Sequence, residues 1–156
     1  MPSIERADPV IMGHILAEHR EFFDLLSSAR GAFADALGGR AENAATRLGE
    51  RLSCLRDHLQ RHFSSEERGG YLEEASTRMP RLAADVKAVL AEHPVLLAQL
   101  DALIAEVSSS ATVPQPRDLR TLEREFEEFS RNLGNHERTE NAVVQAGYNE
   151  DLGLAD

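Results

Sequence analysis

Hydrophobic residues recur at spacings of three and four along most of the chain, which is the pattern of amphipathic α-helices. Four such helices are predicted, over residues of roughly 10–37, 41–68, 80–107 and 118–146. Gly38-Gly39 and Gly69-Gly70 follow the first two helices, and Gly147 is expected to end the fourth. No segment shows the alternation of β-branched residues that is typical of strands. The chain is therefore predicted to be all-α.

Each predicted helix gathers its apolar residues on one side. The connections are short, so the helices are expected to pack as an antiparallel up-down-up-down four-helix bundle in a single domain, residues 1–156. Pro94 is expected to kink the third helix rather than break it, because the apolar pattern continues beyond it. The inward apolar positions are Ile11, Ile15, Phe22, Leu26, Ala29, Phe33, Leu48, Leu52, Leu55, Leu59, Leu82, Val86, Val89, Leu96, Leu100, Ile104, Val107, Leu119, Leu122, Phe126, Phe129, Leu133, Val143 and Val144.

Charge and composition narrow the classes of partner. With 27 acidic and 17 basic residues the formal net charge is −10, which argues against a nucleic acid partner because its phosphates would be repelled. The sequence has no run of 18 apolar residues, so a membrane span is not expected, and the amino terminus lacks an apolar signal core. Together with a single cysteine, Cys54, these features favour a cytoplasmic location. Cys54 is expected to pack rather than to bind a metal, and the sequence identifies no protein partner.

Polar residues interrupt the apolar side of every predicted helix. His19, His62, His93 and His136 lie in these inward rows, and Glu66 and Glu140 follow His62 and His136 by four residues, on the same face. With a rise of about 1.5 Å per residue, the four helices bring these side chains to within about 10 Å of one level. A buried, unpaired carboxylate costs several kcal/mol, and two carboxylates repel each other. Cations between them would remove both costs.

The residue types indicate which metal ions the polar layer would bind. Imidazole and carboxylate ligands without thiolate suit iron, manganese or zinc. Taken alone, His93 also fits a hydrogen-bonded core histidine, and a single HxxxE pair also fits an exposed helix surface; the coincidence of all six residues in one layer favours a metal site. Glu67 and Glu137 are expected on solvated faces. His58, at the edge of the inward row, is expected beside the site rather than among its ligands.

These residues carry a family resemblance. His19, the segment His62-Phe63-Ser64-Ser65-Glu66-Glu67, Glu92-His93, and His136 with Glu140 resemble, in that order, the hemerythrin family, or HHE cation-binding domains, over nearly the whole chain. The resemblance implies a four-helix bundle around a non-haem di-iron centre. Glu66 and Glu140 would bridge the two iron ions and the four histidines would be terminal ligands, with an oxo or hydroxo bridge or water completing the centre.

The sequence departs from the oxygen-carrying hemerythrins at two points. Leu97 stands where those proteins have the second histidine of an HxxxH pair, and the last motif is HxxxE rather than HxxxxD. The chain more closely resembles the hemerythrin-like domains of iron-centre repair proteins and iron-sensing ubiquitin-ligase subunits. We therefore expect a di-iron protein that meets O₂, peroxide or nitric oxide as a sensor, scavenger or iron-handling protein, rather than a dedicated enzyme.

Two alternatives stay open at this point. The first is a di-iron oxidoreductase of the peroxidase or nitric oxide reductase type that uses the same six ligands. The second is a structural bundle whose polar layer holds no metal, or zinc in place of iron. Manganese is a further candidate for the metal.

Overall fold

The computed structural model describes residues 9–39, 43–68, 70–109 and 116–153, with side chains described over 17–39, 43–68, 70–108 and 118–147. Four long helices make up most of it: α1 (Pro9–Leu37), α2 (Ala44–Glu67), α4 (Ala83–Ser109) and α5 (Pro116–Gly153). The connection between α2 and α4 contains the short helix α3 (Tyr71–Arg78) and a 3₁₀ turn, η1 (Pro80–Leu82). The described residues contain no strand.

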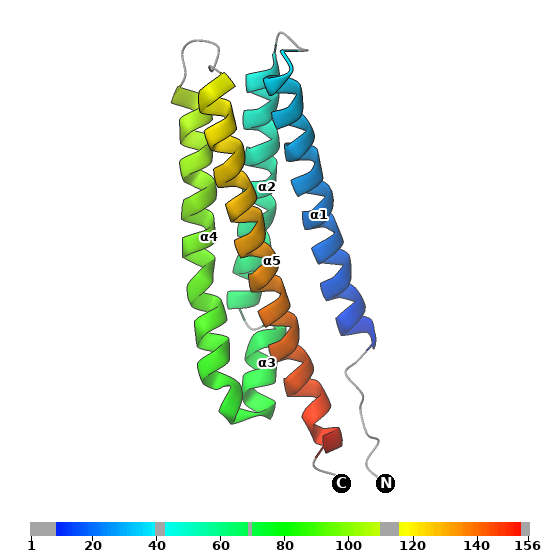
Figure 1. The fold of residues 1–156 in the computed structure, drawn as a ribbon. Coiled ribbons are helices and arrows are strands. Elements are labelled where there is room, and N and C mark those ends of the chain that lie inside the picture. Colours follow the sequence, from blue (N-terminus) through cyan, green and yellow to red (C-terminus); the bar gives the residue numbers. More distant parts are fainter. Residues whose placement is uncertain (1–8, 40–42, 69, 110–115, 154–156) are drawn as a thin grey trace.

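The long helices form an antiparallel four-helix bundle (Figure 1). Helix α1 packs against α2 and α5, and α4 packs against the same two helices on the other side. Successive long helices run in opposite directions, and α3 covers one end of α4 and α5 (Figure 1). The predicted fold class is confirmed, and the helices end within a few residues of their predicted bounds except at the carboxyl end of α5.

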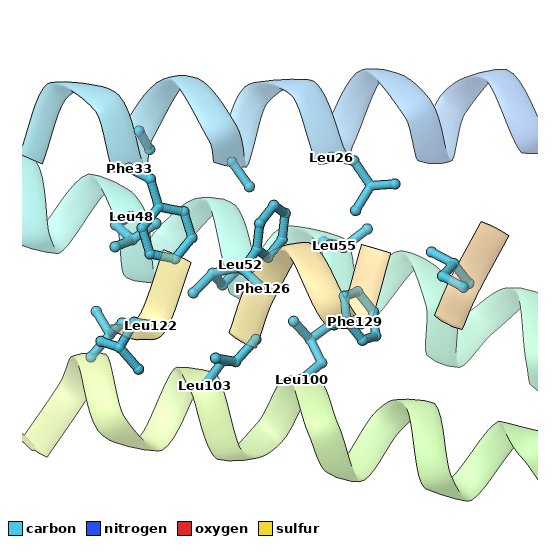
Figure 2. Packing of buried hydrophobic residues seen from close by; sticks show 14 of the residues in the cluster. Leu26, Phe33, Leu48, Leu52, Leu55, Leu100, Leu103, Leu122, Phe126 and Phe129 are labelled. Carbon is cyan, nitrogen blue, oxygen red and sulfur yellow. The ribbon is translucent and has the colours of Figure 1, made fainter. Parts of the chain in front are cut away.

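Apolar side chains fill the bundle in two separate clusters. The larger one contains the leucine and phenylalanine layers shown in Figure 2, among them Leu52 and Phe126, which are fully buried. The smaller one, under α3, consists of Leu72, Val86, Val89, Val143 and Val144. Along α4 and α5 the predicted polar positions fall between these two clusters. Along these two helices the polar layer therefore has an apolar cluster on either side of it.

Helix α4 continues through Pro94 without a break. The segment Pro80–Ser108 has a window of mean hydropathy 1.4, so by length and composition alone it is apolar enough to cross a membrane. A core helix of a water-soluble bundle meets the same criterion, and six residues of α4 from Val86 to Val107 belong to the two apolar clusters. The absence of a membrane span stays a prediction.

Helix α5 does not end at Gly147, contrary to the sequence prediction, but continues to Gly153. Gly147 is buried where α5 crosses α3. A Cβ atom at this position would lie 2.5 Å from the Cβ and 2.7 Å from the Cα of Ala75. The glycine is thus required by the close approach of two helices rather than by a helix end, and the local sequence does not distinguish these two uses.

Gly147→Ala is expected to lower the free energy of unfolding by about 1–3 kcal/mol, because Ala75 presents its backbone to the new methyl group. Gly31→Ala is the matched control: it lies within α1 with no atom within 4 Å of the added Cβ. There the same change should raise stability by up to about 1 kcal/mol through helix propensity. Chemical denaturation of both variants measures the two effects, and equal effects would contradict the close-packing explanation.

Candidate metal centre

The six residues predicted as ligands converge in the polar layer. Helix α1 contributes His19, α2 contributes His62 and Glu66, α4 contributes His93, and α5 contributes His136 and Glu140. All six are buried, with exposed fractions between 1% and 9%. Among the described side chains the other buried polar residues are Ser130 and Glu137. The expectation that the four helices deliver these residues to one layer is confirmed.

The ligand atoms fall into two groups of three. One group, here called the His19 group, consists of His19, His62 and Glu140. The other, the His93 group, consists of Glu66, His93 and His136. Within each group the three candidate ligand atoms lie within 4.8 Å of one another. Each group has the composition of a small metal site, with two imidazoles and one carboxylate.

Both carboxylates lie between the two groups. Glu66 directs Oε1 toward Nε2 of His62 and places Oε2 3.0 Å from Nε2 of His93. Glu140 places Oε1 3.9 Å from Nε2 of His62 and Oε2 3.4 Å from Nε2 of His136. Each carboxylate therefore offers one oxygen to each group, which is the arrangement that a bridging carboxylate requires.

Buried atoms without hydrogen-bond partners show that the residues fit a metal. Such atoms are rare in folded proteins because each one costs free energy. Here they include Nε2 of all four histidines, both oxygens of Glu66 and Oε2 of Glu140. All of these are candidate ligand atoms in the two groups. Cations in the layer would satisfy all of them together.

The opposite ring nitrogen of each histidine is held by a polar side chain of a neighbouring helix. Glu18 on α1 lies 2.7 Å from Nδ1 of His62 on α2, and Glu67 on α2 lies 3.1 Å from Nδ1 of His93 on α4. With Nδ1–H donated to a carboxylate, Nε2 keeps its lone pair for a metal, and the ring cannot rotate freely.

The same contact recurs on the other two helices, so the four contacts close a ring around the bundle. Glu92 on α4 lies 3.1 Å from Nδ1 of His136 on α5, and Asn141 on α5 lies 3.5 Å from Nδ1 of His19 on α1. Each holding side chain is the sequence neighbour of a ligand on its own helix. One turn of helix thus both presents a ligand and orients the histidine of the next helix. Sequence reasoning missed this role, although adjacency to each ligand was a visible signal.

The sequence comparison agrees with this geometry. The family described as hemerythrin HHE cation binding domain matches residues 10–147. The chain belongs to the hemerythrin family. Neither the curated proteins nor the solved structures gave a match to the chain. As a hemerythrin domain it binds metal cations, and its two histidine and glutamate groups are suited to hold them.

Four further side chains had predictions of their own, namely His58, Glu67, Glu137 and Cys54. His58 is partly buried, pairs with Glu21 at 3.2 Å and packs edge-on against Phe22, which in turn contacts His62. It lies beside the centre and belongs to neither group. Glu67 is half exposed, as expected of a solvated face, yet its carboxylate holds His93. Two predictions were wrong: Glu137 is buried, because α1 covers this side of α5, and Cys54 is exposed on the outer side of α2.

Burial and close charges shift the pKa values in the metal-free layer. Burial lowers the pKa of His62, but the carboxylates of Glu18 and Glu66 outweigh it and raise this pKa to about 10. Burial and the neighbouring His62 lower the pKa of His19 to about 4. Burial raises the pKa of Glu140 to about 7. At neutral pH the metal-free layer therefore holds protons where a cation would sit.

Metal binding is expected to release protons. His62 is protonated at neutral pH in the metal-free protein, and a metal on Nε2 must displace that proton. The apparent metal affinity should rise with pH until His62 loses its proton at about pH 10. Titration with a divalent metal in weakly buffered solution containing a pH indicator measures the release. An affinity that stays constant between about pH 6 and pH 9 would contradict this assignment.

Removing one carboxylate from the ring is expected to weaken metal binding. Glu92→Gln leaves an amide against Nδ1 of His136, and we expect a loss of about 10- to 100-fold in metal affinity with little change in fold. Asp85→Asn, an exposed position on the same helix, makes the same chemical change as a control. Equal affinities of the two variants in competition with a chelator would refute the role of Glu92.

Proposed function

We propose that the chain holds two iron ions, one in the His19 group and one in the His93 group, and that Glu66 and Glu140 bridge them. The position of each carboxylate between the two groups carries this proposal. The four histidines would be terminal ligands with their Nε2 atoms. Iron suits this mixture of imidazole and carboxylate, and neither group contains a thiolate. Zinc and manganese are the other outcomes of the test.

The centre would bind O₂, peroxide or nitric oxide as a sensor, a scavenger or an iron-handling protein. Six protein ligands shared between two ions leave coordination positions open. Bound iron would supply one-electron redox chemistry and Lewis acidity at those positions. A pocket of about 740 Å³ reaches His62, Glu66 and Glu140, and Arg61 and Arg68 also line it. A small ligand would approach the centre there, and the two apolar clusters lie on either side of the centre along α4 and α5.

Metal analysis of the protein purified without chelators tests this proposal. We expect two irons per chain and an absorption spectrum with bands of an oxo-bridged ferric pair. The reduced protein should bind nitric oxide or O₂ stoichiometrically. A protein with no metal, or with zinc that iron does not replace, would show that the polar layer is structural.

The pocket also favours a second candidate function. A volume of about 740 Å³ exceeds the needs of a diatomic ligand, and it opens on both carboxylates. A di-iron oxidoreductase of the peroxidase or nitric oxide reductase type would use such space. Catalytic consumption of peroxide or nitric oxide by the iron-loaded protein supports this candidate, and purely stoichiometric binding refutes it.

A further inference from the structure

Glu137 is a buried carboxyl group that the six-ligand centre does not use. Its exposed fraction is 6%, and its Oε1 atom is shielded from solvent without a hydrogen-bond partner. It directly follows His136 and lies one turn before Glu140 on α5, and its electrostatic neighbours include Glu140 and His62. Its carboxylate belongs to neither group as the side chains stand, but Glu137 lines one pocket together with His19 of the His19 group.

Oε1 of Glu137 has no hydrogen-bond partner in the part of the chain whose side chains the structure describes. It lines a pocket of about 400 Å³ between α1 and α5, together with His19 and Asn141. Four arginines line this pocket, and two of them bond elsewhere: Arg30 bonds Glu127 at 2.7 Å, and Arg138 bonds Asn135. A carboxyl group buried in this way is costly unless a cation or a donor meets it.

The two groups also differ in the side chains that hold their histidines. Carboxylates hold both histidines of the His93 group, namely Glu67 on His93 and Glu92 on His136. In the His19 group a carboxylate holds His62, but the neutral amide of Asn141 faces His19. The His19 group therefore has one carboxylate fewer around it, and Glu137 lies on the side where that carboxylate is missing.

We propose that Glu137 is a seventh protein ligand of the centre and binds the ion of the His19 group. This inference rests on the proposed function, since it needs an ion at that position. It makes the two ions chemically different: one would have three carboxylate ligands, of which Glu137 is terminal, and the other would have the two bridging carboxylates only. The ion would also give Oε1 of Glu137 the partner that it lacks among the described side chains.

The test is an anaerobic titration of the metal-free protein with Fe(II) against a competing chelator. The variant is Glu137→Gln, and Glu128→Gln, an exposed position on the same helix, is the matched control. We expect two ions in the parent and in the control. In Glu137→Gln one ion should bind as before and the other about 10-fold more weakly or worse.

Combining Glu137→Gln with a second substitution in the same chain shows which of the two ions is affected. In a His93→Ala background, which damages the His93 group, Glu137→Gln should weaken the remaining ion. In a His19→Ala background it should leave the remaining ion unchanged. Thermal unfolding of the metal-free proteins adds a readout: Glu137→Gln should unfold at the same temperature as the parent or higher, because a buried, unpaired carboxyl group is removed.

The outcomes separate the two claims. Two ions of unchanged affinity in Glu137→Gln would overturn the seventh ligand while leaving the proposed function intact. Equal weakening of both ions, with a lower unfolding temperature of the metal-free variant, would assign Glu137 a structural role and overturn the inference as well. A parent protein that binds no iron would overturn the proposed function and this inference with it.

Discussion

Glu66→Ala and Glu140→Ala are each expected to reduce the metal content below two ions per chain and to remove most of the stability gained from metal. Each carboxylate offers one oxygen to the His19 group and one to the His93 group, so its loss damages both positions at once. A metal that binds the native state but not the unfolded state adds its binding free energy to the stability of the fold. The variants should therefore also lose metal-dependent stabilisation. Metal analysis and thermal unfolding with and without a chelator measure both effects.

Glu50→Ala on α2 and Glu125→Ala on α5 are the matched controls, since both carboxylates are exposed on the same helices. They should keep two metal ions and the full shift of unfolding temperature on metal removal. Two ions in both Glu66→Ala and Glu140→Ala would contradict the bridging roles. Chelation that leaves the unfolding temperature of the parent unchanged would show that metal does not stabilise the fold.

Phe63→Ala is expected to lower the free energy of unfolding by about 3–5 kcal/mol and to weaken metal binding. Phe63 is fully buried, and its ring stacks on His93 at a centroid distance of 3.9 Å with an interplanar angle of 5°. Its ring also meets the ring of His136 edge-on, with centroids 5.4 Å apart. The truncation removes core packing and the support of two histidines of the His93 group together.

Phe23→Ala is the control for the same chemical change, because Phe23 lies on α1 with 58% of its surface exposed. Its effect should stay within about 0.5 kcal/mol. Chemical denaturation of the metal-free proteins isolates the packing effect, and an Fe(II) titration reports the support of the histidines. A metal-free Phe63→Ala protein as stable as Phe23→Ala would rule out the packing role.

Much of the bundle follows from local periodicity. The inward rows around Leu52, Leu100 and Phe126 repeat every three to four residues, so the sequence alone indicates which face of each helix is buried. Helix ends are harder to predict from the sequence, because glycine occurs both at helix ends and where two helices approach closely. Gly147 has the signature of a helix end, yet it allows α5 to approach Ala75 of α3.

The sequence by itself determined the four helices, their inward faces and the six histidine and glutamate residues of the polar layer, because each depends on spacing along one helix. Only the tertiary structure decided how those residues divide into two groups, that Glu18, Glu67 and Glu92 hold histidines of neighbouring helices, and that Glu137 is buried. These features depend on which helix faces which and at what rotation. Packing between helices sets that rotation, and no single helix encodes it.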